Sequence, residues 1–207
     1  MQYLILAAFA VMAACCLRYL HMKHRAGYAL WRRITVKCTA TLMAAAVCLL
    51  GALQNGMAAN WVMLAGLVAC TVADGVLCLH FMAGMACFAL GHVLYIIAFS
   101  MMHLPSWGSL VLFVCMMACI TSLCLRWKRR MGRRAPAFLA YGVLLCLMAA
   151  VSAAQRPLFF AGGLLFAISD ALLAYMMFDR RNVRMDYVSL ALYYLGQFLM
   201  GYAVFLG

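Results

Sequence analysis

The stretch WVMLAGLVACTVADGVLCL, residues 61–79, decides the fold class, because it is apolar throughout except for one carboxylate, Asp74. A second stretch, LFFAGGLLFAISDALLAYMMF at residues 158–178, has the same character and contains Asp170. A helix that spans a bilayer needs about 20 predominantly apolar residues, and both stretches reach this length. The two stretches therefore predict transmembrane helices that each carry a buried acid.

Asp74 and Asp170 are two of only four acidic residues in the chain, all of them aspartates. A charged side chain at the centre of a bilayer costs about 2.5–3.5 kcal/mol on insertion scales, so acids at this depth usually mark a functional site. We therefore take both as candidate catalytic residues. The other two, Asp179 and Asp186, flank a basic loop, and we expect them to be solvated or paired surface charges.

The composition excludes an ordinary soluble domain. The chain of 207 residues is 70% hydrophobic and 10% charged, with a mean hydropathy of +1.04, and a soluble domain could not cover so much apolar surface. The net charge of +12 does not indicate nucleic-acid binding, because the basic residues cluster in loops that flank apolar runs. The eleven cysteines form no CxxC pair and no zinc-site spacing. We expect no metal and no cofactor.

Eight apolar stretches are long enough to cross a bilayer, and the short connections between them predict antiparallel neighbours. The sequence thus predicts an all-α integral membrane bundle of eight transmembrane helices, with residues 1–207 as a single transmembrane domain. The predicted spans are residues 2–20, 34–53, 58–79, 82–101, 107–125, 136–154, 157–178 and 186–206.

The basic residues predict the orientation. All but Arg156 of the 16 lysines and arginines lie in or beside the connections after the first, fifth and seventh spans. Positively charged loops stay in the cytoplasm, so both termini are predicted on the non-cytoplasmic side. We expect a multi-pass protein of a bacterial inner (cytoplasmic) membrane. At 1.5 Å per residue, Asp74 lies about 7–8 Å and Asp170 about 12 Å from the cytoplasmic end of its span, so the two can converge on one cavity.

A short internal similarity indicates a four-plus-four parallel repeat. The fourth span contains ALGHVL at residues 89–94, and the eighth contains YLGQFL at residues 194–199. Each follows a span with a buried aspartate, and both pairs of spans have the same predicted direction.

Other polar side chains at membrane depth are candidates for a supporting or substrate-binding role. Tyrosine, glutamine and serine also hydrogen-bond between helices as structural contacts, and a lysine near a span end can extend to the interface, so a structural role stays open for each. No classical nucleophile, metalloprotease or phosphate-loop motif is present. The candidates are Lys37, His92, Tyr95, Tyr141, Ser169, Tyr193, Tyr194 and Gln197.

In their order and spacing, these residues resemble the lysoplasmalogenase family, also called the YhhN-like family, over residues 30–205. The segment GMACFALGHVLYIIAF at residues 84–99 follows Asp74 and resembles the family's Phe-x-x-x-His-x-x-Tyr stretch. Ser169-Asp170 resembles its Ser-Asp span, and YYLGQ at residues 193–197 its Tyr-Tyr-x-x-Gln motif.

Two further positions match the family and two depart from it. Lys37 matches the lysine that opens the second span, and Tyr141 lies in a segment that resembles the sixth. Cys38 stands where the family usually has proline, which puts a kink there in doubt, and Ala73 stands where it often has glycine.

The resemblance implies hydrolysis of the vinyl ether bond of lysoplasmalogens. The substrates would be lysoplasmenylethanolamine or lysoplasmenylcholine, and the products a fatty aldehyde and glycerophosphoethanolamine or glycerophosphocholine. The implied partners are thus a lysophospholipid substrate and membrane lipids, with no nucleic acid.

Acid–base catalysis by carboxyl groups suits this reaction. Protonation of the vinyl ether at carbon needs a local acid, and burial favours a protonated carboxyl group. A second, ionised carboxylate can stabilise the resulting cation, as paired carboxylates do in glycosidases. Which aspartate is the acid stays open. Four of the candidates would adjust the acidity of the two aspartates or hold water, namely His92, Tyr95, Tyr193 and Gln197. Lys37 and nearby arginines would hold the lipid phosphate.

Two other functions fit the same residues. Buried acids and a parallel repeat also occur in proton-coupled transporters of small molecules or lipids, although here both aspartates lie toward one face and no proline interrupts a span. A non-catalytic lipid-binding or scaffolding protein would keep the aspartates protonated and hydrogen-bonded. Release of aldehyde from substrate separates the enzyme from both.

Overall fold

A computed structural model describes residues 2–25 and 27–207, and this part of the chain folds into eight α-helices with no strand. The turn of 3₁₀ helix η1 (Gly132–Arg134) separates α5 from α6. The helices are α1 (Gln2–Lys23), α2 (Leu30–Asn55), α3 (Ala58–Leu79), α4 (Phe81–Met102), α5 (Trp107–Met131), α6 (Ala135–Ser152), α7 (Pro157–Phe178) and α8 (Val183–Phe205).

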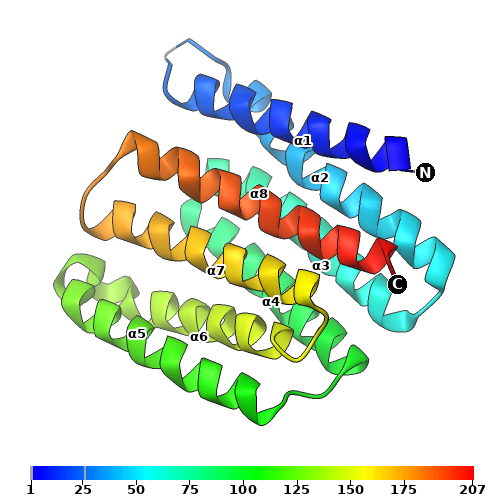
Figure 1. The fold of residues 1–207 in the computed structure, drawn as a ribbon. Helices are drawn as coiled ribbons and strands as arrows, with labels where there is room; N and C mark the ends of the chain where they lie inside the picture. Colours follow the sequence, from blue (N-terminus) through cyan, green and yellow to red (C-terminus); the bar gives the residue numbers. More distant parts are fainter. Residues whose placement is uncertain (1, 26) are drawn as a thin grey trace.

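Within the described residues, seven helical stretches are long and apolar enough to cross a membrane. This finding supports an all-helical integral membrane protein. The run Trp107–Ser152 counts as one stretch of 46 residues, but it contains η1, where the chain reverses so that α5 and α6 lie side by side (Figure 1). The number of eight spans therefore stays a prediction.

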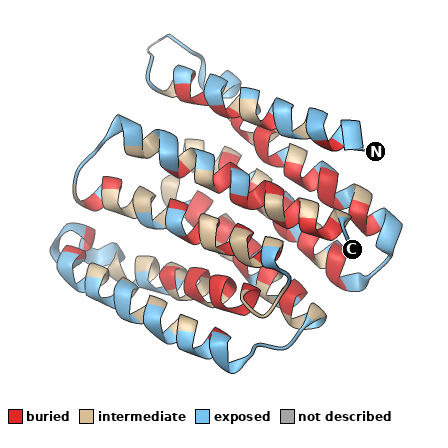
Figure 2. Ribbon diagram, viewed as in Figure 1, coloured by how far each residue is buried: buried red, intermediate tan, exposed pale blue. Residues whose placement is uncertain are grey.

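Six of the helices form a closed ring around the core. In the order α2, α3, α4, α6, α7 and α8, each packs against the next, and α8 packs against α2. The remaining two lie outside this ring, α1 mainly against α2 and α5 mainly against α6 (Figure 1). Figure 2 shows the consequence, since α1 and α5 are exposed over most of their length while the ring helices bury their inner faces.

The two ends of the bundle differ in their connections. Both termini lie at one end, and the basic loops between α1 and α2, α5 and α6, and α7 and α8 lie at the opposite end (Figure 1). This segregation is the arrangement that antiparallel neighbours produce. Which end faces the cytoplasm stays a prediction.

Close glycine contacts recur at matching places in the two halves of the chain. A Cβ atom on Gly91 of α4 would lie 3.4 Å from the carbonyl oxygen of Gly66 of α3, and one on Gly196 of α8 would lie 2.8 Å from that of Gly162 of α7. Gly66 and Gly162 each stand eight residues before an aspartate of the same helix, Asp74 and Asp170. The last helix of each half also packs against the second helix of the other half: α8 packs against α2, and α4 packs against α6. Both features are compatible with the four-plus-four repeat, which stays a prediction.

Candidate functional site

The polar candidates form two separate hydrogen-bonded groups in the core of the ring, one around each buried aspartate. We call the first the Asp74 cluster, which consists of Lys37 and Thr41 of α2, Asp74 of α3 and Tyr193 of α8. We call the second the Asp170 cluster, which consists of His92 of α4, Tyr141 of α6 and Asp170 of α7.

The Asp74 cluster contains a buried ion pair with hydroxyl partners. The Lys37 Nζ atom lies 2.9 Å from Asp74 Oδ1. The other carboxylate oxygen, Oδ2, accepts hydrogen bonds from the Thr41 hydroxyl and, at 2.9 Å, from the Tyr193 hydroxyl. Lys37 is 5% exposed and Asp74 is fully buried. Because a buried charge is tolerated only with a close partner, Lys37 and Asp74 hold each other in place.

The helix geometry of α2 produces this arrangement. Lys37 and Thr41 are one turn apart, so both side chains lie on the face toward α3. The ammonium group of Lys37 also lies 5.7 Å from the centre of the Tyr19 ring of α1. On its backbone, Lys37 accepts a 3.3 Å hydrogen bond from the Tyr194 hydroxyl. Lys37 is therefore part of the packed core.

In the Asp170 cluster, a tyrosine connects the acid to a histidine. The Tyr141 hydroxyl donates to Asp170 Oδ2, and the Nε2 atom of His92 lies 3.2 Å from the same hydroxyl oxygen. The Tyr141 hydroxyl hydrogen is directed to Asp170, so the hydroxyl oxygen can only accept from His92. We therefore assign a hydrogen to His92 Nε2. His92 is fully buried, and its ring packs edge-on against Phe166 at 4.8 Å.

The two carboxyl groups differ in their partners. Asp74 has a cation and two hydroxyl groups, whereas within residues 2–25 and 27–207 Asp170 has one hydroxyl group and no cation within ion-pair distance. Its Oδ1 atom makes no hydrogen bond in this part of the chain. Asp74 thus has a cation at one carboxyl oxygen and two hydroxyl groups at the other, whereas among the described residues Asp170 has a partner at Oδ2 alone.

Asp170 and Tyr141 lie in the wall of an apolar cavity of about 360 Å³. The cavity lies among α4, α5, α6 and α7, and the end of α3 closes one side. Cys119 of α5 and Met177 of α7 line it and are also exposed. The cavity therefore opens on the outer surface of the bundle, where lipid chains lie in a membrane. Its volume falls in the range of about 300–1,000 Å³ that small-molecule sites occupy.

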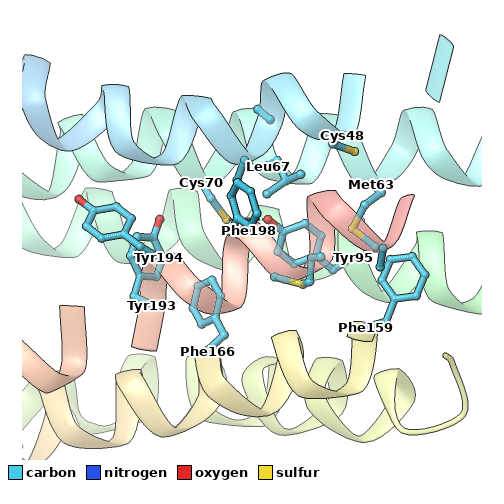
Figure 3. Close-up of a cluster of buried hydrophobic side chains, with 14 of the residues drawn as sticks. Cys48, Met63, Leu67, Cys70, Tyr95, Phe159, Phe166, Tyr193, Tyr194 and Phe198 are labelled. Carbon is cyan, nitrogen blue, oxygen red and sulfur yellow. Dashed lines mark hydrogen bonds between the residues drawn. The ribbon is translucent and has the colours of Figure 1, made fainter. Parts of the chain in front are cut away.

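The two clusters are neighbours without direct contact. In the described part of the chain, no hydrogen bond or ion pair joins the two carboxyl groups. A path of contacting rings leads from Tyr193 to Phe166 at 5.2 Å and from Phe166 to His92 at 4.8 Å, and Figure 3 shows Phe166 of α7 beside Tyr193 of α8. The predicted convergence is therefore indirect.

The remaining candidates connect helices and lie in neither cluster. The Tyr95 hydroxyl of α4 donates to Gln197 Oε1 of α8 at 2.7 Å. The Ser169 hydroxyl donates to the backbone oxygen of Ser189 at 2.7 Å, and the Ser189 hydroxyl donates in return to the backbone oxygen of Ser169 at 2.9 Å. Ser169 thus bonds α7 to α8, although it precedes Asp170 in sequence.

Thr41 is the member of the two clusters that the sequence reasoning missed. A threonine in a predicted span is unremarkable, because its hydroxyl can bond to its own helix. The available signal was its spacing, since Thr41 lies one turn after Lys37, toward the interior of the span. Within residues 2–25 and 27–207, no group of three or more histidine, cysteine or acidic side chains is arranged to hold a metal ion.

Comparison with known proteins gives one match. The model of the YhhN family matches residues 32–204, which is most of the chain. No curated protein and no solved structure matches the chain. The matched region begins shortly before Lys37 and ends near the end of α8, so it contains both clusters.

Proposed function

Since the chain belongs to the YhhN family, which includes lysoplasmalogenases, we propose that it is a membrane-embedded hydrolase of lysoplasmalogens. It would cleave the vinyl ether bond of lysoplasmenylethanolamine or lysoplasmenylcholine. The products would be a fatty aldehyde and glycerophosphoethanolamine or glycerophosphocholine. The observation that carries this proposal is the position of Asp170 in the wall of an apolar cavity, with no cation within ion-pair distance among the described residues.

The cavity suits a lipid with one chain. Its lining is apolar apart from a few groups that include Asp170 and Tyr141, and its opening between α5 and α7 faces the lipid phase. A volume of about 360 Å³ lies at the small end of the range for ligand sites, which favours one alkenyl chain over two. The lipid would enter sideways from the bilayer and place its vinyl ether group beside Asp170.

We assign the proton donor to Asp170 and a positioning role to Asp74. A carboxylate without a cation in an apolar cavity is costly, so Asp170 is held as the neutral acid. Its Oδ1 atom, which makes no hydrogen bond within the described residues, would carry the proton. Asp74 shares its charge with Lys37, and it fixes the Tyr193 hydroxyl next to the ring path that leads to His92.

The reaction follows from this assignment. Asp170 donates its proton to the carbon of the vinyl group that is remote from the ether oxygen, and the double bond supplies the electrons of the new C–H bond. The carbon next to oxygen becomes an oxocarbenium ion, which the Asp170 carboxylate stabilises. Water adds to this carbon and returns a proton to Asp170. The hemiacetal then breaks its bond to the glycerol oxygen, which takes the hydroxyl proton, and the aldehyde is released.

Tyr141 and His92 would hold the acid in position. The Tyr141 hydroxyl donates to Asp170 Oδ2, so it turns the free oxygen away from itself, and His92 in turn fixes the Tyr141 hydroxyl. When Asp170 becomes a carboxylate, the Tyr141 hydrogen bond becomes charge-assisted and therefore stronger. This bond lowers the energy of the ion formed in the slow step.

Substrate analogues and one variant test the proposal. Purified protein in detergent is offered lysoplasmalogen, its saturated ether analogue and an ester lysophospholipid, and we expect aldehyde from the first alone. Asp170→Asn should reduce the rate by about 10²–10⁴, the usual contribution of general acid catalysis. The matched control is Asp186→Asn, which loses an acid paired with Lys23 at 2.7 Å outside the cavity.

Three results would contradict the proposal. Full activity of Asp170→Asn would exclude the assigned acid. Cleavage of the ester analogue would indicate ordinary lysophospholipase chemistry. Uptake into proteoliposomes driven by a pH gradient, without cleavage, would favour the transporter.

A further inference from the structure

The end of α5 places two arginines beside one end of the cavity. Trp127 and Met131 are four residues apart, both are buried, and both line the cavity. Arg126 and Arg130 precede them by one residue each and are themselves one turn apart, so the two arginines form an exposed row of their own on α5, beside the buried row. This end of the cavity is also the end of the bundle with the basic loops (Figure 1).

Both arginines are held by one carboxylate. The Nη2 atom of Arg126 lies 3.5 Å from Asp179 Oδ2, and the Nη1 atom of Arg130 lies 3.3 Å from Asp179 Oδ1. Arg130 also donates to the backbone oxygen of Phe178, which lines the cavity. Two guanidinium groups against one carboxylate leave one positive charge in excess. The arginine side chains are 70% and 58% exposed, so a ligand can reach them.

Lys37, the lysine expected to bind the lipid phosphate, is not available at this position. Its ammonium group is buried in the ion pair with Asp74, and Lys37 is not part of the cavity wall. Moving it to a phosphate group would leave the Asp74 carboxylate buried without a cation, which is strongly unfavourable. The phosphate of a lipid in the cavity therefore needs another cation.

We propose that Arg126 and Arg130, held in place by Asp179, bind the phosphate group of the lipid whose chain occupies the cavity. The proposal rests on the proposed function for the presence of that chain. Guanidinium groups suit this role because they bind phosphate oxygens through paired, charge-assisted hydrogen bonds. The excess positive charge of the two arginines over Asp179 favours the negative charge of a phosphodiester group.

The distances agree with this placement. Asp170 and Asp179 are nine residues apart along α7 and its end, or about 13.5 Å at 1.5 Å per residue. In an extended lysophospholipid, the reacting vinyl carbon and the phosphorus atom are about 9 Å apart with bonds of about 1.5 Å. A hydrogen-bond contact of about 3 Å at each end extends the reach of the lipid to about 15 Å, which covers this spacing. A lipid with its vinyl group at Asp170 is therefore long enough to bring its phosphate to the level of Asp179, which both arginines contact.

The simpler explanation is that these arginines only orient the protein in the membrane and join α5 to α7. A binding experiment separates the two explanations without depending on catalysis. Purified protein in detergent is titrated with a saturated ether lysophospholipid and with the corresponding 1-alkylglycerol, which has the same chain but no phosphate. The variant Arg126→Gln/Arg130→Gln is compared with Lys128→Gln/Arg129→Gln, which loses equal charge from the same turn of α5 without a contact to Asp179.

We expect Arg126→Gln/Arg130→Gln to bind the lysophospholipid at least about tenfold more weakly, the loss typical of one charge-assisted hydrogen bond. Binding of the alkylglycerol should not change, and the control variant should bind both lipids like the wild type. Equal weakening for both lipids, an equal effect in the control, or no effect would overturn the proposal. If the double variant does not fold, Arg126→Gln alone carries the same comparison. A wild-type protein that binds lysophospholipid but cleaves no vinyl ether would refute the proposed function and leave the phosphate site intact.

Discussion

Replacing Lys37 by methionine tests the different roles assigned to the two buried aspartates. The change leaves Asp74 buried with the hydroxyl groups of Thr41 and Tyr193 but without its cation. Breaking a buried pair in this way costs about 3–5 kcal/mol of folding free energy. Asp74→Asn should also destabilise, because Lys37 then lacks its anion. The double variant Lys37→Met/Asp74→Asn removes both charges, so it should recover about 3 kcal/mol relative to the sum of the single losses.

The assay combines unfolding and activity. Denaturant unfolding in one detergent gives the free energies of the wild type, the two single variants and the double variant, and aldehyde release gives the rates. If Asp170 is the acid, the folded double variant should stay within about tenfold of the wild-type rate, well above the loss of 10²–10⁴ expected for Asp170→Asn.

Two outcomes would refute this reasoning. If the unfolding free energy lost in the double variant equals the sum of the losses in the two single variants, Lys37 and Asp74 do not form a buried pair. A folded double variant as inactive as Asp170→Asn would show that Asp74 takes part in the chemistry, and Asp170 would no longer be the sole acid.

Three further predictions concern the support of the acid, the helix contacts and the cavity. Tyr141→Phe removes the hydroxyl that donates to Asp170, so kcat should fall about tenfold with little change in KM, as when an interaction of the transition state is lost; an unchanged kcat would contradict the role of Tyr141. Gly196→Ala places a Cβ atom 2.8 Å from the Gly162 carbonyl oxygen and should cost about 1–3 kcal/mol in unfolding experiments, whereas Gly108→Ala, whose nearest neighbour would lie at 3.5 Å, should cost nothing measurable. Ala171→Trp adds a large side chain to the cavity wall at an exposed position, so it should raise KM for long alkenyl chains more than for short ones, and equal effects on both would argue against the cavity as the chain site.

Much of the fold follows from hydropathy alone, because a bilayer imposes one length on every crossing helix. The predicted span 157–178 coincides with α7, and 58–79 coincides with α3. The ends differ where polar residues continue a helix beyond the apolar run. For example, α5 extends to Met131 instead of residue 125, since its last turns carry basic residues that are good helix formers but lie outside hydrocarbon.

The partners of the candidate residues were not predictable in the same way. Hydropathy and loop charges give the depth of each residue, but they give neither the rotation of a helix nor its neighbours. Lys37 was predicted near the start of a span, and it lies two turns inside α2. Its pairing with Asp74 depends on which face of α2 meets α3. The bond between Tyr141 and Asp170 depends on the packing of α6 beside α7. Such contacts are set by side chains that are far apart in sequence.

The difference between the two aspartates is what makes the proposed chemistry consistent. A cation beside Asp170 would keep that carboxyl group ionised, and an ionised carboxylate has no proton to give to a vinyl carbon. Asp74 has such a cation in Lys37, and it lies outside the cavity wall. Asp170, at the matching place in the second half of the chain, meets an apolar wall and one tyrosine hydroxyl. The apolar surroundings of Asp170 are therefore as necessary to the proposed reaction as the carboxyl group itself.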